Sequence, residues 1–188
     1  MAPKSTLQEK IDHASSLLQN GRVADAERSI QSALEAEPES IEALYVLAVC
    51  QRFLKQPKDA LATLARLKEL QPAYGRAYQE EGHIYSAAGD ATAALRAYRH
   101  AVSLNDSLIA SWKGIIDLRS GDSTSEAAVD ARRQYEKLAA LPPELLSVRN
   151  MTAEGHYYKA ERLCRLFMKA NPTYVEGMRL LADLGVKS

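Results

Sequence analysis

The sequence predicts an all-α fold, a solenoid of antiparallel helix pairs with about five pairs and a final C-terminal helix. The first observation is an internal repeat of 34 residues, which places Ala26, Ala60 and Ala94 in one register and Pro38 and Pro72 in another. The second is that each repeat holds two short stretches with apolar residues at helical spacing. This period is typical of a helix-turn-helix unit that stacks on its neighbours.

The best-formed copy of the repeat spans residues 75–108. Its two helices are expected to meet at Gly89 and Asp90, because glycine readily ends a helix and aspartate caps the first amides of the next one. Small residues are expected where the two helix axes approach, and aromatic residues between neighbouring pairs. The residues at these positions are Tyr78, Gly82, Tyr85, Ala94, Tyr98 and Ala101.

Those six residues resemble the tetratricopeptide repeat (TPR) family. Its pattern has an aromatic residue, Leu-Gly and Tyr in the first helix, then Ala, an aromatic residue, Ala and a closing Pro. The segment departs from the pattern at Glu81, where Leu is usual, and at Asp106, where Pro is usual. The resemblance implies a TPR-type α-solenoid, which would bind a protein or peptide ligand in its concave groove.

The remaining copies follow in order. In the first, Asn20-Gly21 separates the helices, and in the second Pro57 opens the second helix, where its missing amide costs nothing. A longer turn after Gly121 shifts the second helix of the fourth copy by three residues. We expect a frayed leader at 1–6 and one TPR superhelical domain at 7–188, with repeats at about 7–40, 41–74, 75–108, 109–140 and 141–174 and a final helix at 174–186.

Composition excludes several classes of function. Lys plus Arg equals Asp plus Glu at 24 each, so we expect no binding to nucleic acid or to an anionic membrane through net charge. No apolar run is long enough for a membrane span, and the charged N-terminal stretch is unlike a signal peptide. We therefore expect a cytoplasmic protein. Cys50 and Cys164 are expected to be buried apolar residues.

No residues form a recognisable catalytic or metal-binding set. The four histidines, His13, His83, His100 and His156, have no His or Cys at the spacing that a helical metal site needs. No glycine-rich phosphate loop and no nucleophile elbow occur. We expect no catalytic residue, no metal and no cofactor, and hence no enzymatic activity in this chain.

The candidate site is a partner-binding groove lined by the first helix of each repeat. Aromatic side chains there could anchor a peptide, and cations could bind a carboxylate. The alternative interpretation is that Tyr45 and Phe53 pack against neighbouring helices and that the cations are simply solvated. The predicted groove residues are Tyr45, Val49, Arg52, Phe53, Arg76, Gln79, His83, Lys113 and Asp117.

The C-terminal quarter carries a second resemblance. Residues 141–185 are similar to the TPR region that precedes the sulfotransferase domain in bacterial TPR-sulfotransferase proteins. The matching residues are Leu141, Pro142, Glu154, Gly155, Ala160, Glu161, Leu163, Arg165, Pro172, Thr173, Val175, Arg179, Leu181 and Ala182. This resemblance implies an alternative function, the substrate- or partner-binding region of a larger sulfotransferase whose catalytic domain is absent from this chain.

The final helix suggests self-association. It is apolar over much of its circumference, so we expect either a cap or the first helix of a further unit. A homodimer through this helix would cover Val175, Met178, Leu181 and Leu184. The leading hypothesis remains a non-catalytic protein-protein interaction scaffold.

Overall fold

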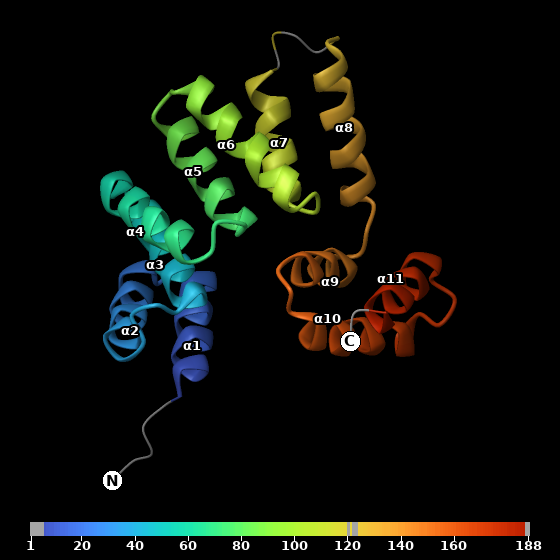
Figure 1. Cartoon of the computed structure of the whole chain (residues 1–188), viewed down its shortest axis with the longest axis horizontal. Helices are drawn as coiled ribbons and strands as arrows, with labels where there is room; N and C mark the ends of the chain where they lie inside the picture. The colour runs from blue at the N-terminus through green and yellow to red at the C-terminus, as the bar shows by residue number, and fades with distance from the viewer. Residues whose placement is uncertain (1–5, 120, 122–123, 187–188) are drawn as a thin grey trace. The chain divides into compact units, whose positions relative to one another are not determined.

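A computed structural model of the chain describes residues 6–119, 121 and 124–186. Within these residues the chain forms eleven α-helices and no strand (Figure 1). The predicted architecture of five helix pairs and a C-terminal helix is confirmed. The expected leader lies outside the described residues except for Thr6, whose side chain caps the first helix by accepting from the Glu9 amide.

The first helix of each pair begins within two residues of the start of a predicted repeat, while the bounds of the repeats themselves remain predictions. The helices are α1 (Leu7–Gln19), α2 (Val23–Ala36), α3 (Ile41–Phe53), α4 (Pro57–Leu70), α5 (Gly75–Ala87), α6 (Ala91–Leu104), α7 (Ile109–Leu118), α8 (Glu126–Ala139), α9 (Pro143–Ala153), α10 (Tyr157–Ala170) and α11 (Val175–Gly185).

Glycines in the left-handed conformation end the first helix of three pairs. Gly21, Gly89 and Gly155 have φ angles of 73°, 79° and 79°. Each glycine N–H donates to the carbonyl three residues earlier, and the next N–H donates to the carbonyl five residues earlier. This is the Schellman arrangement, which satisfies the last carbonyls of a helix. After Gly89, Asp90 Oδ1 accepts from the Ala93 amide at 2.9 Å, so the predicted cap is confirmed.

The chain divides into two compact units, Met1–Ala94 and Leu95–Ser188, and each is described by itself. The boundary falls inside α6. That residues 7–188 form one superhelical domain remains a prediction.

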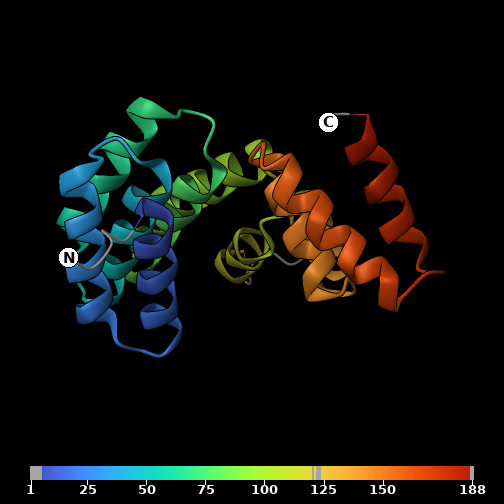
Figure 2. The same cartoon turned by 90° about the horizontal axis from the view of Figure 1, so that it is seen from below.

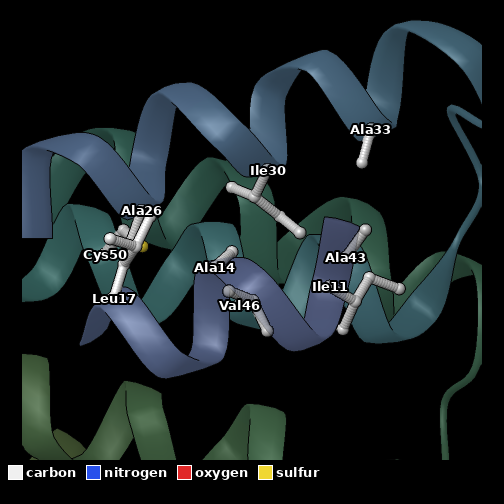
Figure 3. Packing of buried hydrophobic residues seen from close by; sticks show 9 residues of the cluster. All are labelled: Ile11, Ala14, Leu17, Ala26, Ile30, Ala33, Ala43, Val46 and Cys50. Atoms are coloured by element: carbon white, nitrogen blue, oxygen red, sulfur yellow. The ribbon is translucent and has the colours of Figure 1, made fainter. Parts of the chain in front are cut away.

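The core of the first unit consists of two clusters. In the first, α1, α2 and α3 each contribute three buried side chains, and in Figure 3 these point into the space between the helices. Ala14, Ala26 and Ala33 are fully buried in this cluster, together with larger residues such as Ile30. The second cluster joins α3, α4 and α5 through Leu44, Leu64, Leu67 and their neighbours. Because both clusters draw on α3, this helix is the centre of the unit.

In the second unit, α9, α10 and α11 lie side by side, as the orange and red helices of Figures 1 and 2 show. They share a core that includes Leu145, Val148, Cys164 and Leu184. Before them, α7 packs against α8. In α8, Ala131 and Leu138 are buried and Tyr135 is half-buried, as the shifted register predicts. Two residues of the longer turn, 122 and 123, lie outside the described residues.

The departure from the repeat pattern at Asp106 has a structural reason. Its carboxylate lies 3.3 Å from the Arg149 guanidinium of α9, and Arg149 Nε also donates to Ser107 Oγ at 3.0 Å. The Asp106 carbonyl accepts from Trp112 Nε1 at 2.8 Å. A proline at this position would supply no carboxylate for Arg149.

Candidate partner-binding surface

Seven of the nine predicted groove residues lie in the first unit, on α3 and α5. The other two, Lys113 and Asp117, lie on α7 in the second unit. That all nine line one groove therefore remains a prediction, and the two groups are described separately.

Helix α3 presents four of these residues. It begins after Ser40, whose hydroxyl accepts from the Ala43 amide at 3.4 Å. It packs against α1, α2, α4 and α5, so it is buried on several sides. Tyr45, Val49 and Arg52 are half-buried, and Phe53 is exposed.

Tyr45 is chiefly a packing residue. Its ring meets the ring of Tyr74 edge to face, with centroids 5.7 Å apart. It also packs against both core clusters of the first unit. The Arg76 guanidinium lies over the Tyr45 ring, 5.7 Å from its centroid. For Tyr45, the interpretation as a residue that packs between helices fits these contacts.

Arg52 is held by a carboxylate that sequence analysis did not identify. Its Nε donates to Glu80 Oε2 at 2.5 Å, and the Glu80 side chain is only 4% exposed. Because Glu80 comes 28 residues later in the chain and is a common surface residue type, nothing in the sequence marks this pair. Arg52 is therefore positioned and largely neutralised rather than simply solvated.

Phe53 is the exposed aromatic residue of this surface. Its side chain is 56% exposed at the end of α3. The Arg52 guanidinium lies 4.3 Å from its ring centroid, within the range of a cation–π contact. Glu80 thus binds the Arg52 side chain, and the Arg52 guanidinium lies over the Phe53 ring.

Helix α5 presents Arg76, Gln79 and His83, all half-buried. Burial lowers the pKa of His83 below its ordinary value, the Glu80 carboxylate raises it, and the Arg52 guanidinium lowers it further. The lowered pKa favours the neutral imidazole, in which one nitrogen is a donor and the other an acceptor.

A cavity of about 360 Å³ lies where α3 and α5 end and α4 begins. Of its lining residues, only Arg52 was among the predicted groove residues. The described residues that line it are Arg52, Lys55, Pro57, Ile84, Ala87 and Ala88. Lys55 could have been noticed, because it occupies the register position that is glycine at Gly21 and Gly89.

In the second unit, Lys113 and Asp117 form an ion pair one turn apart on α7, with Nζ 2.8 Å from Oδ2. Asp117 raises the pKa of Lys113 through this hydrogen bond and its charge. Both side chains are exposed, and exposed pairs of this kind add little to stability. The interpretation of Lys113 as a solvated surface cation fits this geometry.

The predicted apolar face of α11 is smaller than expected. Leu184 is buried in the core of the second unit, and Leu181 packs against that core, so neither is part of an exposed face. Val175 and Met178 are exposed. The sequence analysis assigned all four residues to one exposed surface, but the side of α11 that carries Leu181 and Leu184 packs against the core of the second unit. Dimerisation through α11 remains a prediction that rests on the two exposed residues.

The described parts of the chain show neither a metal-binding cluster nor a membrane-spanning helix. They contain no group of three or more His, Cys, Asp or Glu side chains placed to bind a metal ion. None of the helices described is both long enough and apolar enough to cross a membrane. Cys50 and Cys164 are free and buried, as predicted, and burial raises the pKa of Cys50 to about 12.

Two family models, both described as tetratricopeptide repeat, match residues 17–80 and residues 75–107. Tetratricopeptide repeats are therefore present in this chain. No curated protein matches it. Both TPR matches end before residue 108, so the resemblance of 141–185 to the TPR region of sulfotransferases remains a prediction.

Solved TPR structures share the fold. The TPR protein TTC0263 of Thermus thermophilus has a TM-score of 0.63 and 19% identity over 96% of this chain and 100% of its own. MamA has a TM-score of 0.61 and 21% identity over 73% of this chain and 81% of its own. A TPR protein of Parabacteroides merdae has a TM-score of 0.57 and 17% identity over 95% of this chain and 72% of its own. The predicted TPR-type α-solenoid is confirmed.

Proposed function

We propose that this chain is a non-catalytic scaffold that binds a peptide segment of a partner protein on the first helices of its TPR units. TPR proteins generally act in protein-protein interaction, and this chain carries the repeats and the fold. In the first unit this surface comprises α3 and α5, the two helices that carry seven of the nine predicted residues.

The observation that carries the proposal is the Arg52–Phe53 pair. Interfaces draw most of their binding energy from a few anchors, among which aromatic residues and Arg are common. An exposed Phe ring costs the isolated protein solvation free energy, and a partner that covers it recovers that free energy. Because the Phe53 ring contacts an Arg52 side chain that Glu80 binds, it should lose less side-chain entropy on binding than a ring without such a contact.

The residues of α5 would add selectivity. Arg76, Gln79 and His83 are polar but half-buried, so hydrogen bonds to a ligand there would be partly shielded from water. The ligand that this surface fits is a peptide with an apolar side chain that covers Phe53.

Selection of peptides from a random phage-displayed library on the immobilised protein tests the proposal. A selected peptide is then titrated against the wild type and against Phe53→Ala by fluorescence anisotropy. Loss of an anchor costs about 2 kcal/mol or more, so we expect the Kd to rise about 30-fold. Arg52→Ala is a poor test, because it would leave the buried Glu80 carboxylate without its cation.

A matched control is Tyr158→Ala, which removes an aromatic ring that is 77% exposed on α10 in the second unit. We expect this variant to bind with the affinity of the wild type. If Tyr158→Ala weakens binding and Phe53→Ala does not, the binding surface lies elsewhere and the proposal is wrong. Failure to select any peptide that binds the folded protein would also contradict it.

A further inference from the structure

The turn between α3 and α4 has the same backbone as three other turns but a different residue at its critical position. Lys55 N–H donates to the Arg52 carbonyl at 3.0 Å, and Gln56 N–H donates to the Gln51 carbonyl at 2.9 Å. This is the arrangement found at Gly21, Gly89 and Gly155. Lys55 has a φ of 60° and is the one non-glycine residue with positive φ in the described part of the chain.

A lysine at this position opposes folding. Only glycine adopts the left-handed conformation without a steric cost from its side chain. Residues held in such conformations concentrate at functional sites, because stability alone would favour glycine there. The question is therefore what the Lys55 side chain does that a glycine could not.

Lys55, which is itself exposed, and Arg52 both line the cavity of about 360 Å³. The other lining residues, Pro57, Ile84, Ala87 and Ala88, are apolar. Of the two cations, Arg52 is already bonded to Glu80. Within the described residues Lys55 forms no ion pair, so it is the cation that can still meet an incoming anion. The cavity thus combines an apolar wall with one available positive charge.

We propose that this cavity, hereafter the Lys55 pocket, binds an apolar side chain flanked by a carboxylate, and that Lys55 is the residue that recognises the charge. The inference rests on the proposed function and names the chemistry of one part of the ligand, a partner segment in which an aliphatic residue lies next to an acidic one. Phe53 adjoins the pocket in sequence, so one peptide could reach both.

The size and composition of the pocket favour this ligand over simpler ones. Its volume is at the lower end of small-molecule sites, which suits one branched side chain. A small inorganic anion would leave the four apolar residues uncovered. A neutral aliphatic group would leave Lys55 with nothing to bind. A ligand with both properties uses the whole lining.

NMR titration with a minimal probe tests the pocket directly. The probe is 4-methylpentanoate, which has the branched end of a leucine side chain and one carboxylate, and its neutral counterpart is 4-methylpentanamide. Added to the 15N-labelled protein, the carboxylate should shift the amides of residues 55, 56, 84, 87 and 88 and should bind about tenfold more tightly than the amide. A titration with sodium chloride controls for ionic strength.

Two variants separate recognition from folding. In Lys55→Gly the affinity for 4-methylpentanoate should fall about tenfold, to that of the amide, while the thermal midpoint is unchanged or higher. In Lys55→Arg the charge is kept, and the carboxylate should still bind more tightly than the amide. A loss of binding with a higher thermal midpoint cannot be ascribed to unfolding.

The proposal is overturned by any of three results. The first is that the pocket amides do not shift at up to about 50 mM probe, a concentration at which millimolar binding would be detected. The second is equal affinity of the protein for the carboxylate and the amide. The third is that Lys55→Gly binds 4-methylpentanoate as tightly as the wild type does. Binding of the phage-selected peptides tests the scaffold function independently of the Lys55 pocket, so failure of the pocket can be distinguished from failure of the scaffold function. If they bind through Phe53 while the small probe does not bind, the Lys55 pocket is wrong and the scaffold function stands.

Discussion

Arg52 of α3 and Glu80 of α5 form an ion pair of 2.5 Å that connects two neighbouring repeats, with the carboxylate almost fully removed from solvent. Removal of one partner of such a pair leaves a buried charge uncompensated. We predict that Arg52→Met destabilises the protein by about 2–3 kcal/mol, below the full cost for a buried pair because Arg52 is partly exposed. Urea unfolding followed by circular dichroism measures this difference.

The double variant Arg52→Met, Glu80→Leu is the control for that measurement. It replaces both charged side chains with apolar side chains of similar size, a change that often has little effect on the free energy of unfolding. We expect it to recover most of the stability lost in Arg52→Met. If the double variant is less stable than Arg52→Met, the two residues are not coupled in the way that their geometry indicates.

The four Schellman turns provide a second prediction, which concerns stability alone. At Gly89 a Cβ would meet no atom within 4 Å, so Gly89→Ala introduces backbone strain without a clash. We expect it to cost about 1 kcal/mol, and we expect Lys55→Gly, the reverse change in the same backbone, to gain about 0.5–1 kcal/mol. The urea midpoints of both variants should therefore move in opposite directions. Two shifts of the same sign would show that the turns are not equivalent.

The sequence predicted the helices well because the signals that specify them are local and repeated. Gly21, Gly89 and Pro57 mark the turns, and the apolar spacing marks the buried faces. The burial of Cys50 and Cys164 followed from the same pattern. Each of these features depends on residues within one repeat, so one sequence is enough to reveal it.

The candidate site was harder to predict, because its chemistry depends on side chains from different repeats. Arg52 and Phe53 were named, but the pairing of Arg52 with Glu80 arises only when α3 packs against α5. Tyr45 was named as an anchor or a packing residue, and the Tyr74 ring that favours packing lies outside the helix that carries Tyr45. Lys55, in contrast, could have been found from the sequence, because alignment of the repeats places this lysine at the position that is glycine at Gly21 and Gly89.

A third prediction concerns pH. The pKa of His83 is lowered in the folded protein, chiefly by burial, so the unfolded chain binds the proton first as pH falls. The stability that depends on neutral His83 is therefore fully present above the ordinary pKa of about 6.5 and is lost as pH falls through the lower folded value. Urea midpoints at about pH 8 and about pH 5 should differ less in His83→Gln than in the wild type.

The exposed His100 provides the control for the pH experiment. His100→Gln removes an imidazole from the protein surface, and its urea midpoints are measured at the same two pH values. If His83→Gln and His100→Gln change the pH dependence of the urea midpoint equally, burial of His83 is not the cause.

The last prediction concerns the close contact of α6 with α7 in the second unit. A Cβ added to Gly114 would lie 2.6 Å from Cζ and 2.8 Å from Cδ2 of Tyr98, a ring that is almost fully buried. Alanine normally stabilises a helix by about 1 kcal/mol relative to glycine, but a buried ring cannot move aside without loss of packing. We predict that Gly114→Ala destabilises the protein by about 1–2 kcal/mol.

Gly177 is the contrasting position, because the atom nearest to its added Cβ belongs to the flexible Met168 side chain. Gly177→Ala should therefore cost less than Gly114→Ala in the same urea measurement. In the double variant Gly114→Ala, Tyr98→Leu, the ring that the alanine methyl group would contact is absent. Part of the stability that Gly114→Ala loses should therefore be recovered. If Gly114→Ala is instead as stable as the wild type, the ring must be able to move, and the small residue at 114 is not required by the packing of the two helices.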